Sequence, residues 1–187
     1  PKGVSPFQPV KAQFQKLPSG MEVLLLEDHE LPFVDLFIYI RGGSILDPEG
    51  KEGFSSVAMQ TIRLGGMEGR GPDEIENELE SVGASLEMGT TREYQTASLS
   101  LLKKDLLSGL EVLFGLLQRP SLDPSRLEIV RSRAQDDLER RMEDPLDLAY
   151  MEYPRLIYGE KSPWGRRPTK KSLDRIVRED LVAFHRQ

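Results

Sequence analysis

Two segments of the chain combine branched and aromatic side chains in the short runs that favour strands. Residues 34–40 are rich in such side chains over a length too short for most helices, so they predict a buried strand. Residues 94–102 place Ala97, Leu99 and Leu101 at alternate positions between polar residues. Because successive side chains of a strand point to opposite faces, this alternation predicts a strand with one buried face.

Two further segments predict shorter strands. Residues 14–26 are interrupted by Pro18, Ser19 and Gly20, a combination of turn residues that predicts a hairpin of two short strands. Another strand is expected near residues 85–89.

Helical patterns lie between and after these strands. Residues 53–64 predict one helix. Pro72 begins a second helix, because proline is favoured in the first turn, and Gly83 ends it. A third helix is predicted over residues 103–118, where repeated leucines form one wide apolar face. These are Leu106, Leu107, Leu110, Leu113, Leu116 and Leu117.

The last part of the chain is also predicted to be helical. Asp123 and Pro124 cap a long helix that runs to about Met142, and Pro145 limits its extent. Residues 172–187 are compatible with a further helix. Its apolar positions are Leu173, Ile176, Leu181, Val182 and Phe184.

The order of these elements predicts an α+β fold, in which a mixed, mainly antiparallel sheet is packed on one side by several helices. We expect one domain over residues 13–187, with Trp164 in its core. Residues 1–12 contain three prolines and are expected to form an arm or linker. No strand follows the last predicted helix, so we expect a piece of a larger protein that ends before the closing strands of the domain.

Composition narrows the range of functions. The 187 residues carry a net charge of −6, with acidic and basic side chains interspersed and no basic stripe, which argues against nucleic-acid binding. No segment approaches the roughly 18 consecutive apolar residues that suggest a membrane span. The chain has no cysteine, which excludes disulfides and thiolate metal sites but does not identify a compartment.

Short motifs on both sides of the predicted helix at 53–64 resemble those of a known family. In chain order they are residues 17–23, 41–44, 47–50, 79–85, 90–94 and 143–145. This order is similar to the N-terminal half-domain of the pitrilysin/insulinase family of inverted zincins, which includes the mitochondrial processing peptidases. The resemblance extends from about Phe14 to the end of the chain.

The resemblance implies where a zinc site would lie. In the family, a helix carries His-x-x-Glu-His, whose two imidazoles bind zinc while the glutamate acts on the attacking water. With the flanking glycines in register, these three positions hold Ser56, Met59 and Gln60 in this chain. The glutamate that serves as the third ligand in the family corresponds to Asp137.

The residues at these positions are unsuited to zinc chemistry. A serine hydroxyl stays protonated and an amide oxygen is a weak donor, so Asp137 alone cannot hold the metal. Met59 can neither give nor take a proton, so the general base is also missing. We therefore expect no cofactor and no catalytic residue, and interpret Ser56, Gln60 and Asp137 as a satisfied polar cluster. Glu93 matches an acidic residue that the family places behind the metal, but here it has no ligand to tune.

The resemblance also implies a peptide-binding edge. The family lays its substrate along the strand after the Gly83-like position, where an Asn-Ala pair contacts the peptide; here the pair is Glu87 and Met88. Backbone groups on an edge strand do not depend on side-chain identity, so peptide contact is expected to be less damaged than catalysis. The residues expected to contact a peptide are Ala84, Ser85, Leu86, Glu87, Met88 and Gly89.

These features favour a zinc-peptidase homologue that is not an enzyme on its own, and that forms a chamber with, binds peptide for, or regulates an active metallopeptidase. The expected partners are a homologous active zinc peptidase subunit or the chain's own C-terminal half, together with a peptide or unfolded polypeptide. One alternative is a divergent peptidase that uses Asp136, Asp137 and Glu93 around another divalent metal. A second is a purely structural domain. Localisation stays open, although the resemblance favours the cell envelope or periplasm for a bacterial source.

Overall fold

A computed structural model describes residues 11–186, and the chain divides into two compact units, Pro1–Pro32 and Phe33–Gln187. The arm predicted for residues 1–12 lies outside the described residues except for Lys11 and Ala12, which belong to no helix or strand.

The first unit contains the predicted hairpin. Strands β1 (Gln13–Lys16) and β2 (Glu22–Leu25) pair antiparallel. In the turn between them, the amide of Leu17 donates to the carbonyl of Met21 at 2.8 Å, and Gly20 adopts a positive φ of 87°. The turn residues therefore act as their sequence predicts.

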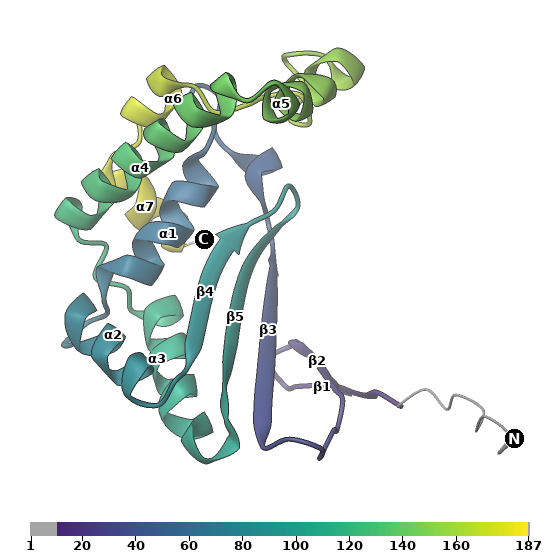
Figure 1. The fold of residues 1–187 in the computed structure, drawn as a ribbon, viewed down its shortest axis with the longest axis vertical. Helices are drawn as coiled ribbons and strands as arrows, with labels where there is room; N and C mark the ends of the chain where they lie inside the picture. Colours follow the sequence, from purple (N-terminus) through teal and green to yellow (C-terminus); the bar gives the residue numbers. More distant parts are fainter. Residues whose placement is uncertain (1–10, 187) are drawn as a thin grey trace, which may run out of the picture. The chain divides into compact units, whose positions relative to one another are not determined.

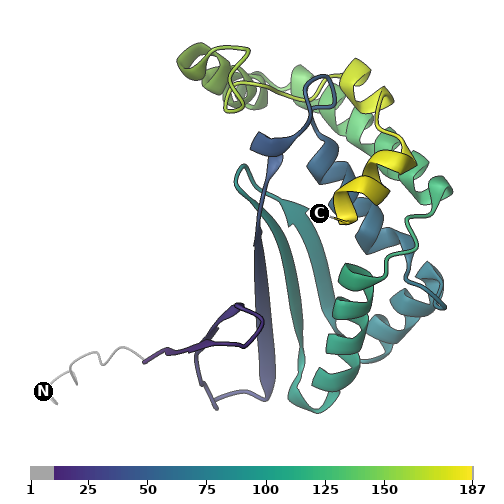
Figure 2. The ribbon, with the colours of Figure 1, turned by 180° about the vertical axis from the view of Figure 1, so that it is seen from behind.

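The second unit is built on a three-stranded antiparallel sheet of β3 (Phe33–Arg41), β4 (Ser85–Thr90) and β5 (Tyr94–Leu102). The strand order is β3-β5-β4, so the last strand in sequence occupies the middle. Figure 1 shows the helices of this unit on one side of the sheet, and Figure 2 shows the same layers from behind. The predicted α+β architecture is confirmed, with antiparallel pairing throughout the described strands.

The helical elements have the following bounds. They are η1 (Ser44–Leu46), α1 (Phe54–Gly65), α2 (Pro72–Ser81), η2 (Lys103–Asp105), α3 (Leu106–Gln118), α4 (Pro124–Glu143), α5 (Pro145–Tyr158), α6 (Lys170–Asp174) and α7 (Arg178–His185), where η marks a short 3-10 helix. The core lies between the helices and one face of the sheet. Leu99 and Leu101 of β5 are buried there together with Leu113 and Leu116 of α3.

Strand β3 is less buried than its composition predicts. Its even-numbered residues Leu36 and Ile38 lie on the helix-covered face and pack against the core, but Phe37 and Tyr39 point to the opposite face and are exposed. The reason is its position: it is an end strand of a sheet that helices cover on one side only. The prediction of a buried strand was therefore wrong for one of its two faces.

Three expectations for the last part of the chain also need correction. Helix α5 is not predicted from the sequence, where Pro145 only limits the extent of the helix before it. In the structure, Pro145 begins α5, and the Asp144 carboxylate caps it by accepting hydrogen bonds from the amides of Leu146 and Asp147 at 2.8 and 3.0 Å. The last predicted helix is two helices, α6 and α7, separated by a short break. Trp164 is 37% exposed instead of lying in the core.

Candidate functional site

Helix α1 is fixed at its N-terminus by a buried carboxylate. Gly53 precedes the helix with a positive φ of 94°, and Asp47 accepts hydrogen bonds from the amides of Gly53 (2.7 Å) and Ser55 (2.9 Å) and from the Ser55 hydroxyl (2.5 Å). These bonds satisfy amide groups that a helix leaves unpaired at its start. Burial raises the pKa of Asp47 above its usual 3.8, although the hydrogen bonds from Ser55 and Gly53 act against this increase.

The C-terminal end of α1 is fixed by a glycine. Gly66 has a φ of 80°, and a Cβ at this position would lie 2.8 Å from the carbonyl oxygen of Arg70. Only glycine fits this conformation and this approach. The glycines that set the register of the family motif therefore mark the two ends of α1.

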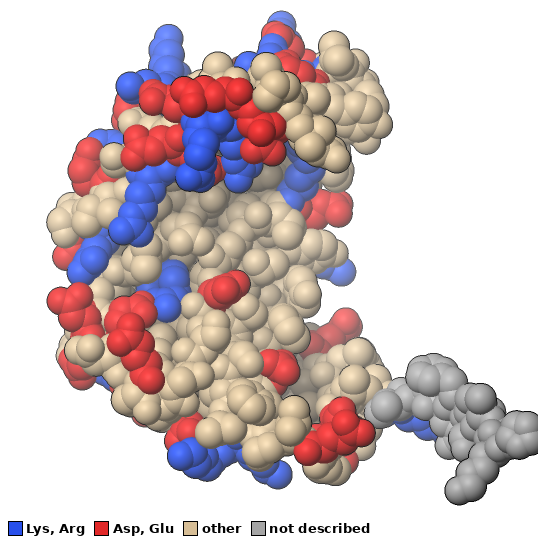
Figure 3. All heavy atoms as spheres, viewed as in Figure 1, with Lys and Arg blue, Asp and Glu red and all other residues tan. Residues whose placement is uncertain are grey.

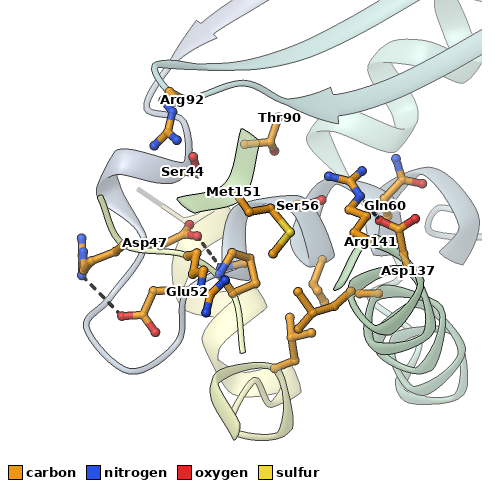
Figure 4. Close-up of a pocket in the computed structure, with 18 of the residues that line it drawn as sticks. Ser44, Asp47, Glu52, Ser56, Gln60, Thr90, Arg92, Asp137, Arg141 and Met151 are labelled. Atoms are coloured by element: carbon orange, nitrogen blue, oxygen red, sulfur yellow. Dashed lines mark hydrogen bonds and ion pairs between the residues drawn. The ribbon is translucent and has the colours of Figure 1, made fainter. Parts of the chain in front are cut away.

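A pocket of about 760 Å³ opens beside α1. Its walls come from α1, α4, α5, the turn between β4 and β5, and the loop before α6. Ser56 and Gln60 of α1 line it, as do Asp137 and Arg141 of α4 and Met151 of α5. In Figure 4, Gln60, Asp137 and Arg141 lie together at one end of the pocket.

The pocket brings three of the four metal-motif positions together but does not join them by hydrogen bonds among the described residues. Ser56 is exposed, and the amide nitrogen of Gln60 donates to the carbonyl of Met88 at 2.6 Å. Asp137 pairs with Arg140 at 2.6 Å and with Arg141 at 2.8 Å. The expected polar cluster is thus replaced by separate pairings.

Met59, on the same helix, does not line the pocket. It is 2% exposed, and it belongs to the hydrophobic core of the unit. A thioether suits this setting because it is apolar and adaptable in shape. Met59 therefore contributes to packing at the position that corresponds to the glutamate of the family motif.

The alternative metal site is not assembled. Within residues 11–186, no group of three or more His, Cys, Asp or Glu side chains is placed to hold a metal ion. Asp136 is exposed on α4, and Glu93 is exposed in the turn between β4 and β5, outside the pocket lining. The recorded bond of Glu93 is structural, because its backbone carbonyl accepts from the amide of Gly42 at 2.8 Å. The proposal of a site formed by Asp136, Asp137 and Glu93 is therefore wrong in its geometry.

The structure places α1 against the outer edge of β4. In addition to the bond from Gln60 to Met88, the Nε of Arg63 donates to the carbonyl of Leu86 at 2.7 Å. Leu86 and Met88 are only 4% and 3% exposed. Peptide contact along Ala84–Gly89 stays a prediction, and pairing in the middle of this edge would displace the side chains of Gln60 and Arg63. No motif in the sequence pointed to Arg63, which lies three residues after Gln60.

Three of the arginines that line the pocket bind groups on other segments of the unit. Arg92 donates to the carbonyl of Trp164 at 2.6 Å, Arg166 donates to the carbonyl of Ile45 at 3.4 Å, and Arg167 pairs with Glu152 at 2.5 Å. Charged side chains gather over α4 and α5 in Figure 3, while the surface over the strands is mostly uncharged. The bonds of Arg92 and Arg166 join residues 72 and 121 positions apart in the sequence, so no local motif predicts them.

Residues 22–153, which include α1, β4, all of α4 and most of α5, match the sequence profile of the insulinase family, peptidase family M16. The chain belongs to this family. The resemblance given by the short motifs is therefore confirmed.

Known relatives of this insulinase-family chain carry the word subunit in their names. The chain is 25% identical over 181 residues to mitochondrial-processing peptidase subunit beta of Blastocladiella emersonii, with 93% of this chain and 37% of that protein aligned. It is 26% identical over 140 residues to cytochrome b-c1 complex subunit 1 of Bos taurus, with 75% of this chain and 29% of that protein aligned. The chain spans about a third of the length of these curated relatives.

A solved structure has the same fold. The peptidase M16 inactive domain from Pseudomonas fluorescens matches with a TM-score of 0.85 and 24% identity, over 94% of this chain and 43% of that chain. At this identity the likeness concerns the fold. None of the helices in the described part of the chain is both long and apolar enough to cross a bilayer.

Proposed function

We propose that this chain is a non-catalytic unit of the insulinase family, which assembles with a homologous unit and contributes a wall to a peptide-holding chamber. The observation that carries the proposal is the chemistry of the α1 wall. At the positions of the family's metal ligands, Ser56 and Gln60 offer no imidazole, and Asp137 is paired with two arginines. A catalytic zinc requires about three protein ligands and an open position for water.

The names of similar proteins support the same proposal. A solved relative in fold is described as an inactive domain, and two relatives in sequence are described as subunits of a processing peptidase and of the cytochrome b-c1 complex. A unit of this kind retains the fold while the chemistry resides in its partner. The partner we propose is a homologous zinc peptidase subunit that keeps His-x-x-Glu-His, or a C-terminal half of the same protein.

The finer proposal is that the chamber holds an extended peptide against β4. Main-chain pairing at a sheet edge gives affinity without a special side chain, so loss of the zinc ligands does not by itself abolish it. The bonds from Gln60 and Arg63 to this edge favour the competing candidate, a purely structural unit without peptide contact.

The first test measures metal, cleavage and assembly. The purified chain should retain no stoichiometric zinc after dialysis and should leave an unstructured peptide intact, yet comigrate in size-exclusion chromatography with a homologous subunit that keeps the zinc motif. About one zinc retained per chain would overturn the non-catalytic assignment. A failure to bind the homologous subunit at micromolar concentrations would overturn the partner role.

The second test rebuilds the metal site. The variant Ser56→His, Gln60→His, Asp137→Glu restores three zinc ligands, and we expect it to bind about one zinc per chain. Adding Met59→Glu restores the general base but places a carboxylate in the core, so this fourfold variant should be less stable. The threefold variant is the matched control, because it should bind zinc without hydrolysing peptide. Absence of zinc from a folded threefold variant would contradict the assignment of these positions.

A further inference from the structure

The outer edge of β4 has an identifiable set of backbone groups. In an antiparallel pair, alternate residues direct their N–H and C=O groups to the partner strand and the others direct them away. The amide of Thr91 donates to the carbonyl of Tyr94, so the odd-numbered residues of β4 direct their N–H and C=O groups to β5. Leu86 and Met88 therefore direct their backbone groups to the outer edge, where an added strand would pair.

Both of these outward carbonyls are already occupied by side chains of α1. Gln60 reaches Met88 at 2.6 Å and Arg63 reaches Leu86 at 2.7 Å. Residues three apart lie on the same face of a helix, so both side chains reach the strand from the same side. A peptide strand would use the same carbonyls as acceptors, so it competes with the two side chains for these oxygens and for the space beside the strand.

We propose that Gln60 and Arg63 form a latch that closes the β4 edge in the isolated unit and admits a peptide only when it opens. This inference rests on the proposed function, because it concerns the regulation of the same peptide edge. Gln60 has two effects at one position: it removes a metal ligand of the family and it occupies a backbone acceptor of the peptide edge.

The two halves of the latch differ in strength. The guanidinium of Arg63 makes an ion pair with Glu76 of α2 in addition to its bond to Leu86, and its side chain is mostly buried. Gln60 makes one recorded hydrogen bond, between neutral groups. Charge-assisted bonds are roughly twice as strong as neutral ones, so Gln60 is the half that opens first.

Single substitutions separate the two halves. Gln60→Glu keeps the shape of the side chain, but an ionised carboxylate cannot donate to the carbonyl of Met88. Arg63→Met keeps an unbranched side chain and removes every donor. The matched control is Gln135→Glu on α4, which loses a comparable bond of 2.7 Å to Asp174 and leaves the β4 edge untouched.

The test combines a peptide titration with the carbonyl ¹³C chemical shifts of Leu86 and Met88. The probe is a capped peptide of alternating valine and threonine flanked by lysines, and its binding is followed by chemical-shift mapping. We expect the double variant Gln60→Glu, Arg63→Met to bind it at least about tenfold more tightly than the native chain, with shifts centred on Leu86 and Met88. Without peptide, the carbonyl ¹³C resonances of these two residues should shift in the double variant, because each carbonyl loses its side-chain donor, and Gln135→Glu should behave like the native chain.

Each outcome separates the latch from the peptide contact. If the native chain binds the probe at β4 as tightly as the double variant, the latch is refuted and the peptide contact stands. If neither binds, the peptide contact fails, and the carbonyl shifts alone decide the latch: changed ¹³C shifts at Leu86 and Met88 support it, and unchanged shifts in a variant with native circular dichroism refute it.

Discussion

Helices α1 and α5 have similar lengths and similar shares of apolar residues, but only α1 is buried. Eight residues of α1 are buried, including the core side chains Val57 and Ile62, while α5 contains no buried residue. Tyr150 and Leu156 of α5 point to solvent. Apolar residues at helical spacing therefore do not decide burial; the elements packed around the helix do.

Helix α1 also differs between its own residues. The buried side of α1 includes Val57, Met59 and Ile62, which pack in the core, while Ser56 lies on its open side. Substitution of ligand positions on the open side leaves packing intact. Of the motif positions on α1, Ser56 and Gln60 thus line the pocket, while Met59 packs in the core.

The largest expected contrast comes from one substitution made in both helices. Ile62→Ala should destabilise the protein by about 2–5 kcal/mol, because Ile62 is 3% exposed and the removed atoms leave a cavity in the core. Ile157→Ala on α5, where the side chain is 54% exposed, should cost less than about 1 kcal/mol. Urea denaturation of both variants measures the difference.

The same pair of variants tests whether α5 is exposed in solution. Equal losses of stability would mean that α5 is covered, for example by association of the chain with itself. Repeating the measurement over a range of protein concentrations separates these cases, because only an associated state changes its stability with concentration.

The caps of the two helices should differ by a smaller amount. Asp47→Ala removes three hydrogen bonds in a buried setting and leaves their donors unpaired, so we expect a loss of about 1–3 kcal/mol. Asp144→Ala at the exposed start of α5 should cost about 1 kcal/mol, the usual value for a helix cap. A loss at Asp144 equal to or greater than that at Asp47 would contradict the buried role of Asp47. Thermal and urea denaturation provide two independent measurements of this order.

Much of the fold could be predicted because its signals are local. The period-two pattern of β5, the leucine face of α3 and the cap at Asp123 each act within a few residues, and each element lies where the sequence indicated it. The exposure of β3 and Trp164 could not be read in this way. The exposure of β3 depends on which face of the sheet the helices cover, and that of Trp164 depends on the packing of the loop between α5 and α6.

The candidate site was predictable in its positions but not in its bonds. The glycines at both ends of α1 placed Ser56 and Gln60, and the spacing to Asp137 placed the opposite wall of the pocket. The partner of Gln60 is a backbone carbonyl of β4, which carries no side-chain signal. The salt bridges of Asp137 were also hidden, since a charged helix offers several partners at suitable spacing.

The smallest expected effect is the change with pH in how much each helix cap stabilises the protein. The hydroxyl and amide of Ser125 lower the pKa of Asp123, the exposed cap of α4, below 3.8. Because the pKa of Asp123 is lower in the folded state, the ionised carboxyl stabilises the fold at pH values above the pKa of the unfolded state. This contribution disappears as the pH falls through the pKa of the folded state. The advantage of the native chain over Asp123→Ala, about 1 kcal/mol near neutral pH, should therefore shrink in acid.

Asp47 should respond in the opposite direction. Burial raises the pKa of Asp47 in the folded state above the unfolded-state pKa of 3.8. The protonated carboxyl therefore stabilises the fold at pH values below 3.8, and this contribution is lost as the pH rises through the pKa of the folded state. The stability of the native chain relative to Asp47→Asn should thus decrease from acid toward neutral pH, while the difference for Asp123→Ala increases. Urea denaturation of the three proteins between about pH 3 and about pH 7 gives both trends. Parallel trends would mean that the carboxyl of Asp47 is as accessible to water as that of Asp123, and the buried cap that distinguishes α1 would have to be abandoned.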